Sequence, residues 1–174
     1  MSDSKPFNTP ISSGSSLFRH DGDTLPQPFL YCNIIGALQY LVHTQLELAF
    51  GFNRACHFMQ SPTTTHWSAI KRILRYLRHT PHHGLLIRPL SSLDISAFSN
   101  SNWAGFPDDH RSTTGYCIFL GDNLISWNSK KQQVVTRSST ESEYRALTHV
   151  TAELIWLQSL LRELCISPLQ PPTI

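Results

Sequence analysis

The pattern of apolar and polar residues divides the chain into an early helical region and a later region of strands and one helix. Two apolar runs between residues 31 and 56 predict a helical hairpin. The next helix is clearer, because four apolar side chains recur at helical spacing: Trp67, Ile70, Leu74 and Leu77. Ser61-Pro62-Thr63 stands just before this run in the order cap then proline, which predicts that the helix begins there.

After residue 90 the apolar period changes from that of a helix to that of a strand. Leu93, Ile95 and Ala97 alternate with polar neighbours, as in a half-buried strand. A polar stretch follows, and then the run TTGYCIFLG leads through Gly121-Asp122-Asn123, a hairpin signal, into LISWN. We therefore expect three antiparallel strands between Leu93 and Asn128.

The longest apolar stripe lies in the last helical segment. Leucine or valine recurs there at spacings of three and four residues: Leu147, Val150, Leu154, Leu157, Leu161 and Leu164. Two pairs before the stripe, Ser138 with Glu141 and Thr140 with Glu143, have the spacing of a capping box.

Glu143 is the acidic residue with the strongest claim to a role. Extending the stripe back by four residues from Leu147 reaches Glu143, which we expect on the face that meets the sheet, whereas Glu141 points elsewhere. A carboxylate on a packing face requires a cation, a metal or a hydrogen-bond donor. The alternative is an exposed cap that stabilises the start of the helix through its dipole.

Composition excludes several classes of protein. The chain has 174 residues, of which 40% are hydrophobic and 15% charged, with 14 Lys and Arg against 12 Asp and Glu. These values exclude a charge-driven disordered protein and a basic arm. No apolar run has the length of a membrane span, and no targeting signal is visible, so we expect a cytoplasmic or nuclear protein without a membrane partner. The four cysteines form no CxxC pair, and neither a zinc site nor a disulfide framework is expected.

Basic residues gather in two places where they could follow a phosphate backbone. The candidate nucleic-acid-binding residues are Lys71, Arg72, Arg75, Arg78, Lys130, Lys131 and Arg137. The alternative is that they form solvated faces that keep the chain soluble, and charge alone does not separate these interpretations.

Several long phrases resemble the C-terminal part of the Pol polyprotein of plant copia-type LTR retrotransposons. They include YCNIIGALQYL, FMQSPTTTHWSAIKRILRYLRHTPHHGLLI and NWAGFPDDHRSTTGYCIFLGDNLISWNSKKQQVVTRSSTESEYRAL. Residues 1–30 are rich in Ser, Pro, Asp and Gly and lack periodicity, which predicts an extended connector. The resemblance implies that residues 1–90 belong to the connection after reverse transcriptase, helical over 31–90, and that residues 91–174 form a truncated ribonuclease H (RNase H) domain. The implied class is α+β: a helical N-terminal segment, then a partial RNase H-like fold of three antiparallel strands and one long helix.

The resemblance also identifies candidate catalytic positions. RNase H cleaves the RNA strand of an RNA–DNA hybrid with two Mg²⁺ ions held by carboxylates. The family motif Ser-Asp-Ala-Asp-Trp-Ala-Gly reads Ser99-Asn100-Ser101-Asn102-Trp103-Ala104-Gly105 here, so Asn100 replaces a metal-binding Asp. Glu143 falls on the second family acid. The third acid belongs to a Cys-Asp-Asn phrase that the 174 residues do not contain. We therefore expect no bound metal cofactor, although the intact family uses Mg²⁺.

Three hypotheses for function follow. The first is a Pol fragment that is catalytically inactive because its acidic metal ligands are replaced or missing. The second is a non-catalytic module that binds an RNA–DNA hybrid through the basic residues. The third is an RNase H endonuclease that a partner chain completes with the missing acids. Loss of the remaining strands of an RNase H-like fold would leave one sheet edge unpaired, which also predicts marginal stability or self-association through that edge.

Overall fold

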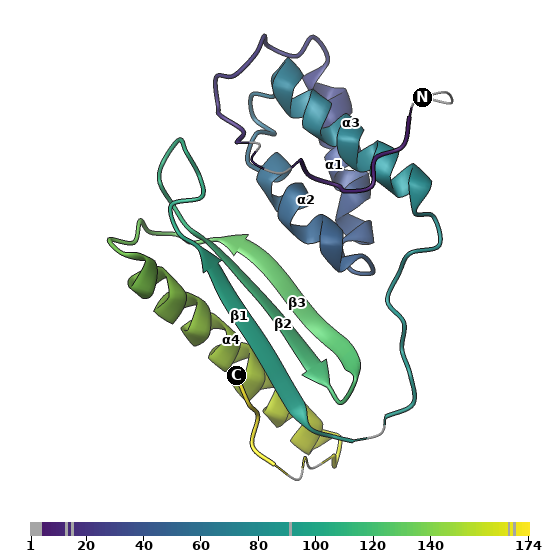
Figure 1. Cartoon of the computed structure of the whole chain (residues 1–174), viewed down its shortest axis with the longest axis vertical. Coiled ribbons are helices and arrows are strands. Elements are labelled where there is room, and N and C mark those ends of the chain that lie inside the picture. The colour runs from purple at the N-terminus through teal and green to yellow at the C-terminus, as the bar shows by residue number, and fades with distance from the viewer. Residues whose placement is uncertain (1–4, 13, 15, 91, 167, 169) are drawn as a thin grey trace. The chain divides into compact units, whose positions relative to one another are not determined.

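In the computed structural model, a helical unit, Met1–Leu85, precedes a unit of three antiparallel strands and one helix, Leu86–Ile174 (Figure 1). Residues 5–12, 14, 16–90, 92–166, 168 and 170–174 are described. The elements are α1 (Pro28–Leu41), the 3-10 helix η1 (Leu46–Leu48), α2 (Ala49–Cys56), α3 (Thr64–His79), β1 (Ile95–Asn102), β2 (Thr113–Leu120), β3 (Asn123–Lys131) and α4 (Ser139–Glu163). This order confirms the predicted α+β class. Among the described helices, none is both long enough and apolar enough to cross a bilayer.

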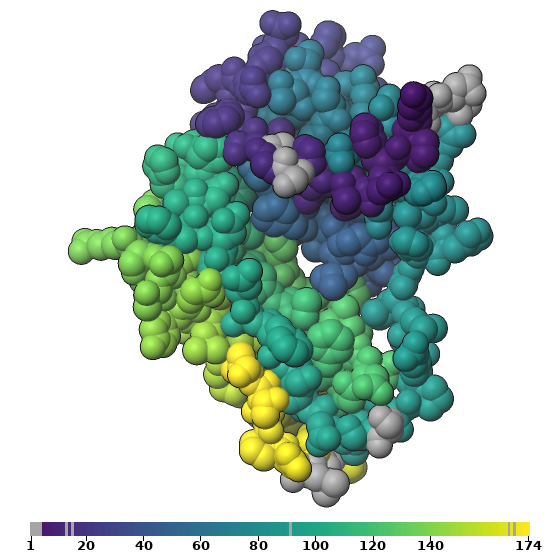
Figure 2. All heavy atoms as spheres, in the orientation of Figure 1, coloured from purple at the N-terminus to yellow at the C-terminus, as the bar shows by residue number. Residues whose placement is uncertain are grey.

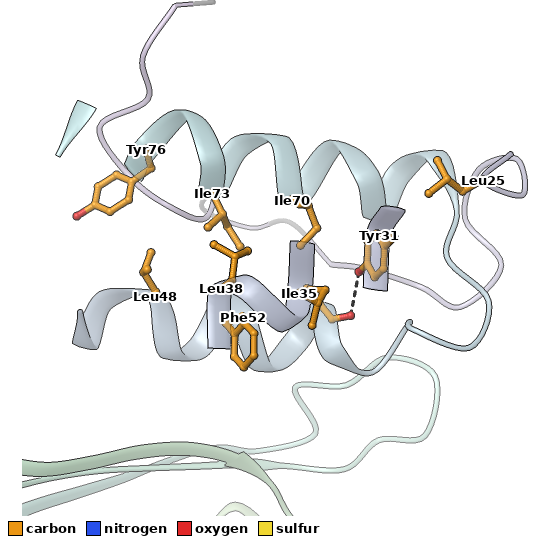
Figure 3. Close-up of a cluster of buried hydrophobic side chains, with 10 residues drawn as sticks. Leu25, Tyr31, Ile35, Leu38, Leu48, Phe52, Ile70, Ile73 and Tyr76 are labelled. Atoms are coloured by element: carbon orange, nitrogen blue, oxygen red, sulfur yellow. Dashed lines mark hydrogen bonds between the residues drawn. The ribbon is translucent and has the colours of Figure 1, made fainter. Parts of the chain in front are cut away.

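The core of the first unit lies between its three α-helices (Figure 3). Tyr31 on α1 is fully buried, and its hydroxyl donates to the carbonyl oxygen of Ala55 on α2 at 2.8 Å. Burial raises the pKa of the Tyr31 phenol well above its ordinary value, so it remains a neutral donor. Ile70 and Ile73 of α3 close the cluster and are 0% and 2% exposed. Trp67 and Leu74, which the helical spacing also placed on this face, lie at its border and are partly buried.

The start of α3 differs from the expected cap-then-proline order. Pro62 lies before the cap, and Thr63 is the N-cap, with its side chain accepting a hydrogen bond from the backbone N–H of His66. The Nδ1 atom of His66 accepts from the backbone N–H of Thr63 at 3.0 Å. Because Nδ1 accepts, the ring proton is on Nε2, which donates to the carbonyl oxygen of Phe18 at 2.9 Å. A fully buried histidine thus completes the capping box and holds the N-terminal segment.

The sheet confirms the three predicted antiparallel strands. Its order is β1-β2-β3, with β1 and β2 paired from Ile95↔Leu120 to Asn102↔Thr113. Leu120 pairs with Asn123, so Gly121 and Asp122 form a two-residue hairpin loop. Gly121 has a φ of +54° and Asp122 has no positive φ, which is the pattern of a type II′ turn with glycine at its first loop position.

Helix α4 covers one face of this sheet (Figure 1). The predicted stripe is right over its middle, because Val150, Leu154, Leu157 and Leu161 are buried. They pack on alternate residues of β1 and β2: Ile95, Ala97, Tyr116 and Ile118. The prediction is wrong at both ends of the stripe, since the side chains of Leu147 and Leu164 are 37% and 59% exposed.

The segment after α4 returns to the edge of β1. Thr173 forms a parallel bridge with Ser96, donating from its N–H to Ile95 O at 3.1 Å and accepting from Ala97 N at 2.8 Å. The sequence pattern gave no sign of this pairing, because residues 169–174 lack any alternation. Part of the β1 edge is therefore paired.

We expect Gly121→Ala to lower the free energy of unfolding of the second unit by about 1–2 kcal/mol. An alanine there would keep a left-handed backbone, and its Cβ would lie 2.8 Å from the carbonyl oxygen of Ser92. Urea denaturation followed by tryptophan fluorescence measures the change. The matched control is Gly115→Ala in β2, where an added Cβ would lie 3.8 Å from its nearest neighbour. Equal effects of the two substitutions would contradict this account of the turn.

Candidate functional site

The end of β1 meets the first turns of α4 through small polar side chains. The hydroxyls of Ser101 on β1 and Ser142 on α4 are in short contact, and Ser142 is fully buried. The buried amide of Gln132, just after β3, donates from Nε2 to Thr114 Oγ1 and to the carbonyl oxygen of Ser142, each at 3.1 Å. Serine at 142 and alanine at 146 let the helix approach the strand closely, which a larger side chain would prevent.

Glu143 is exposed, so its predicted position on the packing face is wrong. Counting back by four from buried Val150 reaches Ala146 and then Ser142, whereas the prediction started from Leu147, which is partly exposed. The expected hydrogen-bond donor nevertheless exists. Oε1 of Glu143 accepts from the backbone N–H of Ser101 at 3.1 Å. The helix therefore presents this carboxylate at its border, against the strand residue that follows Asn100.

Asn100 and Asn102 occupy the β1 positions that alternate with the residues facing α4. Asn100 is exposed and pairs in register with Gly115. The side chain of Asn102 lies over the turn that follows β1, where an added Cβ at Gly105 would overlap its amide. The Ser101–Glu143 hydrogen bond places Glu143 at the end of the sheet that also holds Asn100, the other position that the resemblance singles out.

These donors do not fit a pair of divalent cations. The set consists of one carboxylate, Glu143, with the neutral amides of Asn100 and Asn102, whereas Mg²⁺ binds through charged oxygen ligands in such sites. Across the described residues, no three His, Cys, Asp or Glu side chains lie close enough together to hold a metal ion.

Glu141 has a structural role at the start of α4. Its backbone N–H donates to Ser138 Oγ at 3.1 Å, so Ser138 with Glu141 is the capping pair that forms. The carboxylate of Glu141 accepts from the backbone N–H of Arg137 at 2.9 Å and from the guanidinium of Arg145 at 2.9 Å. These two donors, in that order, lower the pKa of Glu141 below its ordinary value.

The basic residues of the first unit lie beside aromatic rings. The ammonium of Lys71 lies 5.7 Å from the ring centre of Trp67. The guanidinium groups of Arg72 and Arg75 lie 4.3 Å and 5.5 Å from the ring centre of Phe7. The remaining predicted residue on this helix, Arg78, is exposed. Two of the four cations thus face the N-terminal segment.

In the second unit, the structure adds two basic residues to the predicted set. Lys130 and Lys131 line a hollow of about 290 Å³ together with Arg145 and His149 of α4. Lys131 also pairs with Asp109 at 2.7 Å. The i, i+4 spacing of Arg145 and His149 on one helix face was the available signal for this pair. Arg137, the last predicted residue, is exposed and is not among the residues that line the hollow.

Comparison with known proteins shows similarity to part of the Pol polyproteins of plant transposons. The chain is 46% identical over 174 residues to the retrovirus-related Pol polyprotein from transposon RE2 of Arabidopsis thaliana, and 44% identical over 174 residues to that from transposon RE1. It covers 12% of the length of each of these two polyproteins. An uncharacterized mitochondrial protein of Arabidopsis thaliana, AtMg00810, is 44% identical over 160 residues, which are 90% of this chain and 65% of that protein. No family model and no solved structure matches the chain.

The fold defines an α+β protein whose second unit is a partial RNase H-like fold, with three antiparallel strands and a covering helix. Over all 174 residues the chain is similar to a segment of the retrovirus-related Pol polyproteins of plant transposons, which is consistent with a copia-type Pol fragment.

We expect Ser142→Ala to destabilise the second unit by about 1–2 kcal/mol, because it removes a fully buried hydroxyl that contacts the Ser101 hydroxyl and accepts from Gln132 Nε2. Glu143→Gln should change the free energy of unfolding by less than about 0.5 kcal/mol, since the exposed glutamine still offers an oxygen to the Ser101 amide. Urea denaturation of both variants measures the contrast. A larger loss for Glu143→Gln would show that residue 143, and not residue 142, lies on the packing face.

Proposed function

We propose that this chain is a Pol fragment with an RNase H-like fold that does not cleave RNA. One observation carries the proposal: a neutral amide, Asn100, stands in β1 at the position where the resemblance leads us to expect a metal-binding carboxylate. The other family acid, Glu143, lies at the same end of the sheet and accepts a hydrogen bond from the adjacent backbone of Ser101.

The charge difference between Asp and Asn supports this proposal. Two-metal hydrolysis places two divalent cations about 4 Å apart, and the surrounding carboxylates offset their mutual repulsion. An amide oxygen coordinates without a negative charge, so Asn100 leaves Glu143 to offset both cations alone. Glu143 also lies in solvent, where water competes with it for the ions.

A second candidate function is binding of an RNA–DNA hybrid without cleavage. The observation that favours it is the hollow at Lys130, Lys131, Arg145 and His149, where several basic side chains converge. Gln132 also lines this hollow, and its buried Oε1 has no hydrogen-bond partner within the described part of the chain. A free acceptor beside cations suits a polyanion that carries hydroxyl donors, as the RNA strand does.

We expect no cleavage of a labelled RNA–DNA hybrid by this chain with either Mg²⁺ or Mn²⁺. Product formation on a denaturing gel is the measurement. Cleavage that disappears in Glu143→Gln would overturn the proposal and favour the third hypothesis, an endonuclease completed by acids of a partner. Cleavage that persists in Glu143→Gln would come from a contaminating nuclease, and repurification would be required to obtain the chain's own activity.

Restoring the family carboxylate should create a weak metal site. We expect Mg²⁺ to raise the free energy of unfolding of Asn100→Asp by about 1 kcal/mol when the Mg²⁺ concentration is about five times the dissociation constant. Mg²⁺ should leave the free energy of unfolding of the wild type unchanged. The matched control is Asn100→Asp with Glu143→Gln, which should lose the effect. An equal response of the wild type would show that Asn100 is not what prevents metal binding.

If the second function holds, hybrid binding should weaken steeply with salt, and Lys130→Gln should reduce the slope of log K against log salt concentration by about one. Fluorescence anisotropy of a labelled hybrid at several salt concentrations measures both quantities. Arg162→Gln, also exposed but near the end of α4, is the matched control and should leave the slope unchanged. Binding that does not depend on salt would exclude this function.

A further inference from the structure

The first unit contains a cavity that the proposed function does not use. It has a volume of about 530 Å³ and lies between the N-terminal segment and helices α2 and α3. Figure 2 shows the start of the chain, in purple, lying on the blue and teal atoms of these helices. The volume is within the range of pockets that hold small organic molecules.

The walls of this cavity are largely apolar. They include side chains from both sides of the space: Phe7, Pro10, Ile11 and Leu17 from the N-terminal segment, with Ala69 and Ile73 from α3. Gly51 of α2 also lines it, and an added Cβ there would lie 2.8 Å from Ile11. The N-terminal segment therefore packs directly on α2 at one point and leaves open space beside it.

Four cationic side chains also line the cavity, and none of its described lining residues is acidic. These are Arg54, Lys71, Arg72 and Arg75. Arg72 is held in place, since its guanidinium donates to Thr9 Oγ1 at 2.7 Å and to Thr9 O at 3.2 Å. Arg75 has a buried Nε with no hydrogen-bond partner in the described structure. Burial also lowers the pKa of Arg54.

Guanidinium groups in an apolar wall are stabilised when an anion pairs with them. We propose that this cavity binds an amphipathic organic anion, with its apolar body between Ile11 and Ile73 and its anionic head at Arg75 and Arg72. The ligand class is a single carboxylate or sulfonate on a hydrocarbon or aromatic body, such as a fatty acid. A polyphosphate or a nucleic-acid backbone fits less well, because it has no apolar part to cover these walls.

Two dyes that differ by one charged group test the proposal on the full chain. 8-Anilinonaphthalene-1-sulfonate carries the anionic head, and N-phenyl-1-naphthylamine is the same body without it. We expect the sulfonate dye to bind at least about tenfold more tightly, and dodecanoate to displace it. Fluorescence titration measures each affinity. Equal affinities, or displacement by an oligonucleotide and not by dodecanoate, would overturn the proposal.

Two variants locate the binding. Arg75→Met should lower the affinity for the sulfonate dye about tenfold and leave the affinity for the neutral dye unchanged. Arg78→Met, on the same helix but outside the cavity, should change neither affinity. Ala69→Phe fills the cavity and should lower the affinity for both dyes. Binding to exposed apolar patches would be unaffected by this substitution, so the variant separates the two kinds of binding. Thermal melts confirm that each variant folds. Sulfonate binding that survives both Arg75→Met and Ala69→Phe would place the dye elsewhere and overturn the assignment.

Discussion

The second unit depends on the packing of α4 against one face of its sheet. Val150, Leu154, Leu157 and Leu161 supply the apolar contact, and the small residues Ala146 and Ser142 bring the start of the helix close to β1. This close approach brings the Ser142 hydroxyl into contact with the Ser101 hydroxyl. It also places the carboxylate of Glu143 at the border of the interface, where it accepts from the Ser101 backbone. The geometry of the candidate site is therefore a consequence of side-chain volume along the helix.

The same geometry separates the residues that pack the second unit from the polar residues at the end of β1. Asn and Asp have nearly the same shape, so Asn100 occupies its place in β1 with the strand pairing intact. They differ in charge, and charge is what a site for two divalent cations requires. The residues that hold the second unit together are therefore not the amides at 100 and 102, on which our proposal about metal binding rests.

Cations in the first unit illustrate a second separation, between the charge of a residue and its availability. Arg72 and Arg75 have the spacing of a phosphate-binding helix face, yet both lie over Phe7 of the N-terminal segment. There they line an apolar cavity in place of an open surface. Lys130, by contrast, is exposed beside a hollow that contains Arg145 and His149. The surroundings of these basic side chains thus differ although their charges are the same, and our two binding proposals rest on that difference.

Sequence alone determined the strands, the long helices, the hairpin at Gly121 and the family, because periodicity, turn chemistry and long matching phrases are local properties of the chain. It placed Glu143 on the wrong face, since a stripe of leucines does not show which of them stay exposed at the ends of the interface. It also missed His66 as a cap, the return of Thr173 to β1, and the cavity beneath Phe7. Each of these joins residues distant in the chain or depends on the space between elements, so only the tertiary structure decided them.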